Sequence, residues 1–224
     1  MDQLSRSRVR KKKGARDRLI RLALSRPEWA LGFEDETWWS RFERPSLHSW
    51  ADAEQPVRLI EKEAIKGDSD PKALAAYGML VRTTTEADGR IQERTWLRFV
   101  DGRPVSSITT QFLEYSCQKL AAMGKKALLM IWDNASWHTS KEVRSWIEEH
   151  NRAVKKSGRG VRIVPCLLPK KSPWLNSIEP KWIHGKRKVV EPERLLSAYE
   201  LADRVCKAFG CAHEPHLSIP QEVA

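Results

Sequence analysis

The sequence predicts an α/β protein with a mixed central sheet flanked by helices. Six consecutive apolar residues, Ala127–Trp132, fit a strand that is buried on both faces. A helical pattern and a second apolar run at 161–168 follow it, which is typical of parallel strands joined through a helix. Earlier in the chain, Asp88 and Gly89 form a turn signal between two strand-like segments, which indicates an antiparallel pair. The sheet is therefore expected to be mixed.

The composition favours a polyanionic partner. The 224 residues include 40 Lys and Arg against 29 Asp and Glu, for a net charge of +11 at pH 7. Such an excess of positive charge points most simply to nucleic acid. The four cysteines show no disulfide-framework spacing, and the sequence shows neither a signal-peptide pattern nor an apolar run of membrane length. We therefore expect a reducing, cytoplasmic setting.

Residues 1–26 carry most of the excess charge. They hold ten Lys or Arg residues against Asp2 and Asp17. We expect the first part to be disordered, or ordered only on a partner, with a short helix at 15–25. Contact with nucleic-acid phosphates and a solvated tail explain this charge equally well.

A short apolar strand is predicted at residues 29–33, and three acids follow it at once. They are Glu34, Asp35 and Glu36. Three acids at a strand end are unfavourable unless a cation lies nearby or the strand runs out into water. The alternative is that they form an edge hairpin turn.

Strand predictions for the next part of the chain differ in strength. Residues 40–72 are broken by prolines and predict only short strands, at Trp50 and at 57–60. The patterns at 72–82 and 91–100 are clearer. Together with the first strand, these two segments are expected to form an antiparallel meander.

Two helices are predicted from the spacing of apolar residues. Residues 106–123 place apolar side chains near one face. The second helix, at 139–150, begins with Thr139 and Glu142 in a capping-box pattern. The basic stretch 151–160 is expected to be a loop that leads into the second apolar strand.

The central strand ends on a carboxylate, Asp133, and Asn134 follows it. Open α/β sheets bind ligands at the carboxyl ends of their strands. A charge at this place must be paired, metal-bound or at a wet crevice, because burying it alone costs too much free energy. The alternative is that Asp133 only caps a turn.

A further helix is predicted to open within residues 174–182. Asn176 is its expected N-cap and Glu179 the N3 residue of a capping box, which would explain Glu179 on structural grounds alone. A last amphipathic helix is expected at 192–209. The Cys and His residues near the C-terminus match no standard zinc spacing; they are Cys206, Cys211, His213 and His216.

Three segments together resemble the catalytic blocks of the bacterial mariner-like DDE transposases, the enzymes of a large insertion-sequence family. The segments are FEDETWW at 33–39, IWDNASWHTSKEV at 131–143 and LLPKKSPWLNSIEPKW at 167–182. The third match is the longest and most specific. The resemblance covers about residues 29–188 and implies a ribonuclease H-like fold, with which the order of the predicted elements agrees.

The resemblance implies metal-dependent DNA cleavage and strand transfer. Asp35, Asp133 and Glu179 would converge on two Mg²⁺ or Mn²⁺ ions roughly 3.5–4 Å apart, and oxygen ligands suit such ions. The first attack would hydrolyse the transposon end, and the second would join the freed 3′-hydroxyl to target DNA, usually at TA. Polar groups near these acids would support them or, in the case of Asn134 and His138, contact DNA; they are Glu36, Asn134, His138 and Asn176.

The resemblance also implies a path for DNA phosphates along basic side chains, with the chain acting as a homodimer on DNA. The basic residues on this path are Lys170, Lys171, Lys181, Lys186 and Arg187, and the charge of the N-terminal segment adds Lys11, Lys12 and Lys13 as candidate DNA contacts. As charge clusters alone, they are more often a solvated face. Asp133 and Glu179 are 46 positions apart, a longer separation than the family usually shows. We expect the loop at 151–160 to absorb the excess.

The domain organisation departs from that of full-length relatives, which carry helix-turn-helix domains before the catalytic domain. We expect a basic tail or linker at 1–28, a catalytic domain at 29–190 and a C-terminal helix and tail at 191–224. A separate helix-turn-helix protein from an upstream reading frame would then recognise the transposon ends. Two alternatives stay open: a truncated or domesticated fragment that acts only as a DNA-binding protein, and a ribonuclease H-like nuclease.

Overall fold

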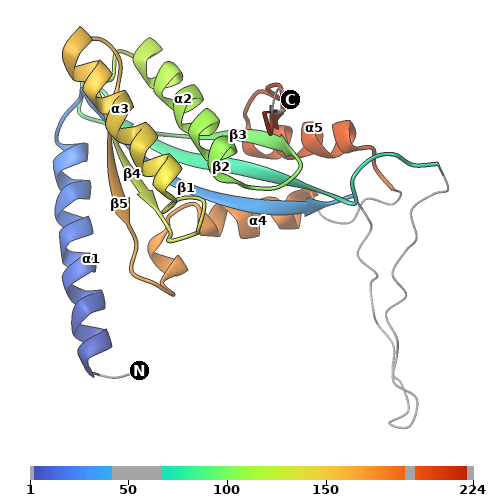
Figure 1. Ribbon diagram of the computed structural model, residues 1–224, viewed down its shortest axis with the longest axis horizontal. Helices are drawn as coiled ribbons and strands as arrows, with labels where there is room; N and C mark the ends of the chain where they lie inside the picture. The colour runs from blue at the N-terminus through green and yellow to red at the C-terminus, as the bar shows by residue number, and fades with distance from the viewer. Residues whose placement is uncertain (1–2, 42–66, 190–194, 221–224) are drawn as a thin grey trace.

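A mixed six-stranded sheet forms the centre of the protein (Figure 1). The computed structural model describes residues 3–41, 67–189 and 195–220. The strands are β1 (Trp29–Ser40), β2 (Ala73–Thr84), β3 (Ile91–Asp101), β4 (Ala127–Trp132), β5 (Arg162–Leu167) and β6 (Leu217–Ser218). Their order in the sheet is β5-β4-β1-β2-β3-β6. The meander β1-β2-β3 is antiparallel, whereas β4 runs parallel to β1 and to β5, so the predicted mixed sheet is confirmed.

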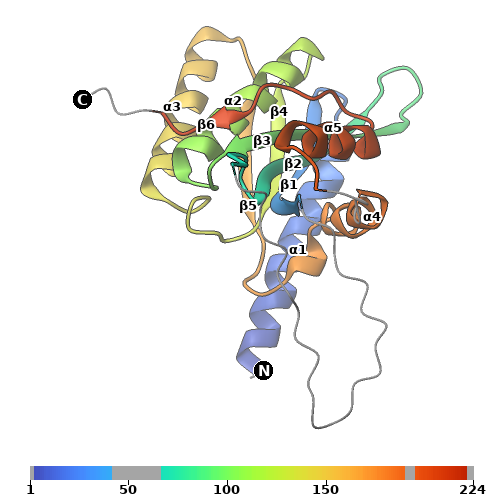
Figure 2. The ribbon, with the colours of Figure 1, turned by 90° about the vertical axis from the view of Figure 1, so that its right-hand side faces the viewer.

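Helices cover both faces of this sheet. They are α1 (Gln3–Leu24), α2 (Ser106–Ala122), α3 (Lys141–Ser157), α4 (Glu179–Val189) and α5 (Ala198–Phe209). One apolar cluster joins the sheet to α2 and α3, and a second joins the other face to α1, α4 and α5. Figure 2 shows the two groups of helices on either side of the sheet. Among the described residues, no helix is both long and apolar enough to cross a membrane.

Strand β4 is the element that the sequence predicts best, because an unbroken run of six apolar residues is typical of a buried strand. All six of its residues are buried between the two helical layers, and its bounds are those of the apolar run. Its neighbour β5 differs from the buried strand that was expected. It lies at the end of the strand order, and three of its six residues, Arg162, Pro165 and Leu167, are exposed, which suits an edge strand with a partner on one side only.

Strand β1 is longer than predicted. It runs to Ser40, so the three acids lie within the strand rather than at its end, and the alternative of an edge hairpin turn is wrong. The pairing with β4 stops at Phe33 and Ile131, while the pairing with β2 continues to Ser40. Beyond Phe33 the strand is therefore paired on one side only, and the hydrogen bonds to β2 keep it extended through the charged residues.

Helix α1 is also longer than the short helix that was expected, and it contacts the rest of the fold. Ala23 is 2% exposed, and Leu19, Ile20 and Leu24 pack against the same apolar cluster. Arg16 Nη1 donates to the carbonyl of Leu175, at 2.5 Å. These contacts fix the C-terminal half of α1 beside the loop that follows β5.

Several other predicted boundaries change. Helix α3 includes most of the predicted loop and ends at Ser157, so helix rather than loop absorbs much of the long spacing between the acids. Its cap is Ser140, which accepts from Val143 N, and the capping box predicted from Thr139 is wrong.

Helix α5 begins at Ala198, after Ser197 as its cap. The strands predicted at Trp50 and 57–60, and the predicted start of the last helix at residue 192, lie outside the described residues. Strand β6 was not predicted.

Candidate metal-dependent active site

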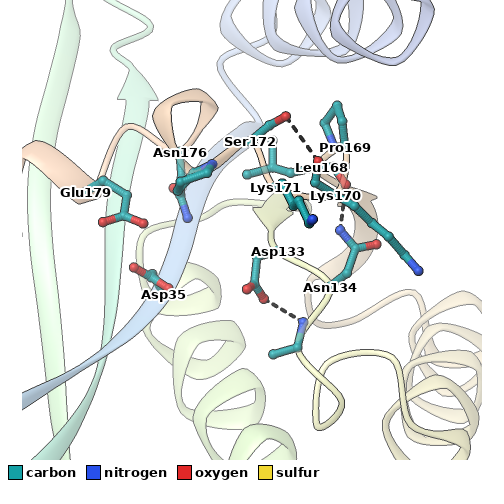
Figure 3. Close-up of a pocket in the computed structure, with 12 residues that line it drawn as sticks. Asp35, Asp133, Asn134, Leu168, Pro169, Lys170, Lys171, Ser172, Asn176 and Glu179 are labelled. Atoms are coloured by element: carbon teal, nitrogen blue, oxygen red, sulfur yellow. Dashed lines mark hydrogen bonds between the residues drawn. The ribbon is translucent and has the colours of Figure 1, made fainter. Parts of the chain in front are cut away.

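A cavity of about 520 Å³ opens where β4 and β5 end. Asp35, Asp133 and Glu179 all line it. They come from the middle of β1, the residue after β4 and the first residue of α4. Figure 3 shows the carboxylates of Asp35 and Glu179 pointing toward one another, with Asp133 beside them. The structure thus brings together three acids that are distant in the sequence.

Alternation along β1 decides which acid reaches the cavity. Successive side chains of a strand point to opposite faces, so Asp35 faces one way and Glu34 and Glu36 face the other. Asp35 lies on the face of α4, where it meets Glu179. It also lies two positions beyond the last residue of β1 that pairs with β4. The missing partner strand leaves space for the cavity.

The surroundings of Asp35 disfavour its negative charge. Burial, together with the negative charges of Glu179 and Glu36, raises the pKa of Asp35 to about 7. The indole Nε1 of Trp182 donates to Asp35 Oδ2 at 2.9 Å and acts in the opposite direction. Carboxylates that repel one another in this way form a site of strong negative potential.

Trp182 reaches Asp35 because one residue of β2 has no side chain. Gly78 pairs with Asp35 in the sheet register. A Cβ on Gly78 would lie 2.2 Å from Trp182 Cη2 and 2.6 Å from Cζ2. The indole therefore lies across Gly78, with its other contacts to the rings of Trp39 and Phe209.

Asp133 is held differently. Its side chain is 52% exposed, and its Oδ1 accepts from Ala135 N at 2.8 Å and faces His138 Nδ1 at 2.8 Å. The hydrogen bond with His138 lowers the pKa of Asp133, and the bond from Ala135 N acts in the same direction. Asp133 is therefore an ionised, half-exposed carboxylate that lines the cavity. It does accept a hydrogen bond within its turn, but the alternative that it only caps a turn does not account for the contact with His138.

Glu34, Glu36 and His138 form a second acidic group on the opposite face of β1. His138 is 2% exposed, and its Nε2 lies 2.9 Å from Glu36 Oε1 and 3.2 Å from Glu34 Oε2. Although burial disfavours its charged form, the charge of Glu34 and the hydrogen bonds to Asp133 and Glu36 raise the pKa of His138 to about 11. Burial raises the pKa of Glu34 well above its usual range. Within the described residues, this group has ligand atoms that all lie within 4.8 Å of one another.

Asn134 and Asn176 both hold backbone carbonyls near the cavity. Asn134 Nδ2 donates to Leu168 O at 2.7 Å, and Asn176 Nδ2 donates to Glu34 O at 2.8 Å. Asn176 closes the short 3-10 helix Pro173–Leu175 rather than capping α4. Because Glu179 is the first residue of α4, the predicted capping box is wrong, and its structural explanation of Glu179 is removed.

The predicted basic residues are distributed over three places. Lys170 and Lys171 line the cavity, and the backbone of Lys171 has a φ of 56°, a left-handed conformation that is strained for a side-chain-bearing residue. On α4, Lys181 Nζ pairs with Glu93 at 2.7 Å, Lys186 Nζ lies 5.9 Å from the Trp39 ring, and Arg187 is exposed. Lys12 and Lys13 are exposed on α1, and the side chain of Lys11 lies outside the described residues.

Three residues near these acids were not predicted to belong to the site: Glu34, Trp137 and Trp182. Trp182 follows Glu179 by three positions, a spacing that places both on one side of a helix, so helical periodicity could have identified it. Trp137 Nε1 donates to Glu36 Oε1 at 2.7 Å, and no sequence pattern indicates that contact. Glu34 could have been paired with Glu36 from the period of two along a strand.

The cavity suits a divalent cation. Its three carboxylates supply the oxygen ligands that Mg²⁺ and Mn²⁺ prefer. The raised pKa of Asp35 reflects a repulsion between carboxylates that a cation in the cavity would relieve. The fold and this pocket define a ribonuclease H-like protein with an acidic, metal-compatible site.

The chain belongs to the DDE superfamily endonucleases, whose family model matches residues 64–201. The match includes Asp133 and Glu179, and Asp35 precedes it. Members of this family are metal-dependent, in agreement with the acidic cavity. No curated protein matches the chain.

Solved structures of the Mos1 transposase have the same fold. The Mos1 transposase paired-end complex with the left transposon end has a TM-score of 0.53 at 15% sequence identity and covers 95% of this chain. The Mos1 strand transfer complex has a TM-score of 0.56 at 14% identity and covers 95%. The Mos1 mariner paired end complex with Mn has a TM-score of 0.57 at 14% identity and covers 94%. The chain spans 56% of the length of each of these proteins.

We predict that Gly78→Ala displaces Trp182 from Asp35. The added Cβ would overlap an indole ring that neighbouring rings hold in place, so the free energy of unfolding should fall by roughly 1–3 kcal/mol. Gly32→Ala on β1 is the matched control, because its Cβ would meet the flexible thioether of Met79. Thermal melts and near-ultraviolet circular dichroism measure the effect. Equal changes in melting temperature and in near-ultraviolet circular dichroism for the two variants would contradict this packing.

We predict that Asp35 makes the metal-free protein less stable as the pH rises. Its pKa is about 7 in the folded protein and about 3.9 in an unfolded chain, so between these values the folded state binds more protons. Stability due to this group is therefore present below about pH 4 and lost as the pH rises through 7. Asp35→Asn should raise the melting temperature at pH 8 in EDTA and raise it much less at pH 5. A shift that is the same at both pH values would contradict this assignment.

Proposed function

We propose that this chain is the catalytic domain of a transposase that cuts and joins DNA at the cavity. One observation carries the proposal: three acids from β1, the end of β4 and the start of α4 line a single pocket. Family membership supports the same chemistry. Asp35, Asp133 and Glu179 would hold two divalent ions, Mg²⁺ or Mn²⁺. When bound, such ions activate the attacking water or 3′-hydroxyl and neutralise charge on the leaving oxygen.

The other residues of the pocket bind and orient. Trp182 Nε1 donates to one oxygen of Asp35, Oδ2, and so orients the carboxylate. Asn134, the residue after Asp133, is hydrogen-bonded to Leu168 just beyond β5. Asn176, in the segment before α4, is hydrogen-bonded to Glu34 of β1. These bonds fix the three elements that carry the acids relative to one another. Lys170 and Lys171 supply positive charge beside the acids, where a DNA phosphate would have to lie.

DNA is the proposed substrate in both steps. The net charge of +11 supports a polyanion, and exposed Lys12 and Lys13 on α1 extend the basic surface. The neighbouring Mos1 structures include a complex with a transposon end and a strand transfer complex. Transposon ends and a TA target are the specific DNA sites we propose for this chain.

The assembly is a further part of the proposal. A homodimer would hold two DNA ends, and a separate helix-turn-helix protein would supply end recognition. The division into a basic segment at 1–28, a catalytic domain at 29–190 and a C-terminal part at 191–224 also stays a prediction. Because Ala23, Leu19, Ile20 and Leu24 pack in the apolar cluster, we propose that residues 19–24 belong with the catalytic domain.

We predict that Glu179→Gln abolishes cleavage and leaves the fold intact. Gln has nearly the shape and helix propensity of Glu at the first position of α4, but it lacks the charge that binds a cation. Metal-free stability should rise slightly, because the repulsion with Asp35 is removed. Mg²⁺-dependent cleavage and joining of DNA that carries the element's own ends should fall by orders of magnitude.

The matched control for this test is Glu142→Gln, which changes an exposed acid in the first turn of α3. It should cleave like the wild type. If Glu179→Gln retains wild-type cleavage, the assignment of Glu179 is wrong. If the wild type cleaves DNA without joining it to a target, the chain is a nuclease rather than a transposase.

We predict that Lys170 and Lys171 raise DNA affinity by neutralising phosphates. Replacing both with Ala should lower the slope of log affinity against log salt by about 0.9 for each phosphate that is no longer neutralised. Replacing Lys155 and Lys156, in the last turn of α3, is the control and should leave the slope unchanged. Fluorescence anisotropy of duplex DNA at several salt concentrations measures this slope. Equal slopes for the two double variants would place the phosphate path elsewhere.

A further inference from the structure

His138 is placed between two carboxylates that belong to different parts of the molecule. Its Nδ1 lies 2.8 Å from Asp133 Oδ1, and its Nε2 lies 2.9 Å from Glu36 Oε1. The imidazole is buried and stacks on the ring of Trp132 at 4.8 Å between centroids, with 17° between the planes. This packing leaves the ring little freedom to turn, so both contacts are set by the fold.

The far end of this chain of contacts is also fixed. Trp137 Nε1 donates to the same Glu36 oxygen at 2.7 Å. Glu36 lies on β1, whereas Trp137 and His138 belong to the turn after β4. Two side chains of that turn are therefore bound to one carboxylate of the neighbouring strand, on the face of the sheet away from Asp35.

Asp133 needs such support, because its own position gives it little. It follows the last residue of β4, and half of its side chain is exposed. Among the described residues, its carboxylate has one hydrogen bond apart from that with His138, and it comes from Ala135 N in its own turn. A contact that ties the metal-facing carboxylate to β1 would therefore fix the distance between Asp133 and Asp35.

We propose that His138 and Glu36 are positioning residues that hold the Asp133 carboxylate in its metal-binding orientation. The proposal rests on the proposed function, because it takes Asp133 as a metal ligand. Groups that orient metal ligands in this way typically change metal affinity or activity about 10–100-fold when they are replaced. We call the contacts from Asp133 through His138 to Glu36 the tether. The tether lies on the face of the sheet away from Asp35, so neither residue needs to contact the DNA or the cation.

Glu34 belongs to the buried group with Glu36 and His138, but it is not part of the hydrogen-bonded link between Asp133 and Glu36. Its Oε2 lies 3.2 Å from His138 Nε2, yet neither of its oxygens makes a hydrogen bond of good geometry. The three residues also have the spacing of a small metal site. We assign hydrogen bonds instead, because each ring nitrogen of His138 already faces a carboxylate oxygen and Trp137 shares the Glu36 oxygen.

Two substitutions of His138 separate its two contacts. The amide nitrogen of Asn can reach the position of Nδ1 and so donate to Asp133, whereas that of Gln can reach the position of Nε2 and so donate to Glu36. Because the link between Asp133 and Glu36 needs both contacts, it predicts that His138→Gln and His138→Asn each weaken Mn²⁺ binding and DNA cleavage about 10–100-fold. A role in packing alone predicts that His138→Gln stays close to the wild type, because Gln fills more of the space than Asn.

His150 provides a matched control on α3. It stacks on Trp146 with centroids 5.0 Å apart, and its Nε2 contacts the carbonyl of Val161, so it is also a stacked, hydrogen-bonded imidazole, although it is less buried than His138. His150→Ala should lower the melting temperature without changing the Mn²⁺ dissociation constant. Titration of the full chain with Mn²⁺ alone, in the absence of DNA, gives this constant for each variant.

Crystal structures of the metal-free wild type and His138→Gln test the tether without any activity. The Asp133 carboxylate should leave its wild-type position in the variant. An unchanged Asp133 position, or equal Mn²⁺ affinity of wild type and variant, overturns the proposal. A variant that combines Asp35→Asn, Asp133→Asn and Glu179→Gln tests for a separate metal site. If this variant still binds Mn²⁺, and His138→Gln abolishes that binding, the proposal is overturned in favour of such a site. A wild type that binds no Mn²⁺ and cuts no DNA refutes the proposed function, and the crystal structures still decide the tether.

Discussion

The structure depends on the point at which β1 loses one of its two partner strands. The parallel pairing with β4 ends at Phe33 and Ile131, but β1 continues to Ser40 beside β2. Backbone hydrogen bonds to β2 hold the next residues extended, and the absence of β4 opens a cavity beside them. Strand alternation then sends Asp35 into that cavity and sends Glu36 to the other face, so one charged stretch serves two separate environments.

Each of the two aspartates is held from a different layer of the fold. Trp182 of α4 binds Asp35 from one face, and Gly78 makes room for its ring. His138 contacts Asp133 and, through Glu36, connects it to the other face. The difference suits the two acids, because Asp35 is within a strand that fixes its backbone, whereas Asp133 follows the end of one. Support from rigid elements is what a site needs when its carboxylates repel one another in the absence of a cation.

Sequence reasoning succeeded where the physical constraint is local. The apolar run of β4 is typical of a buried strand, and its carboxyl end locates Asp133. It failed where partners are distant: the bond from Trp137 to Glu36 joins residues about a hundred positions apart, and no local pattern encodes it. The length of β1 was also missed, because charged residues argue against a strand until β2 is known to pair with them. Similarly, Glu179 fits a capping box by sequence, whereas the structure places it at the first position of α4.

The central claim is that the cavity lined by Asp35, Asp133 and Glu179 holds the catalytic cations. Anomalous diffraction from crystals soaked in Mn²⁺ tests it most directly, because the anomalous signal of manganese distinguishes this cavity from the buried group on the other face of β1. The account predicts anomalous density between these three carboxylates, and loss of that density in Glu179→Gln. Density confined to Glu34, Glu36 and His138, or no density in the cavity at saturating Mn²⁺, would contradict it.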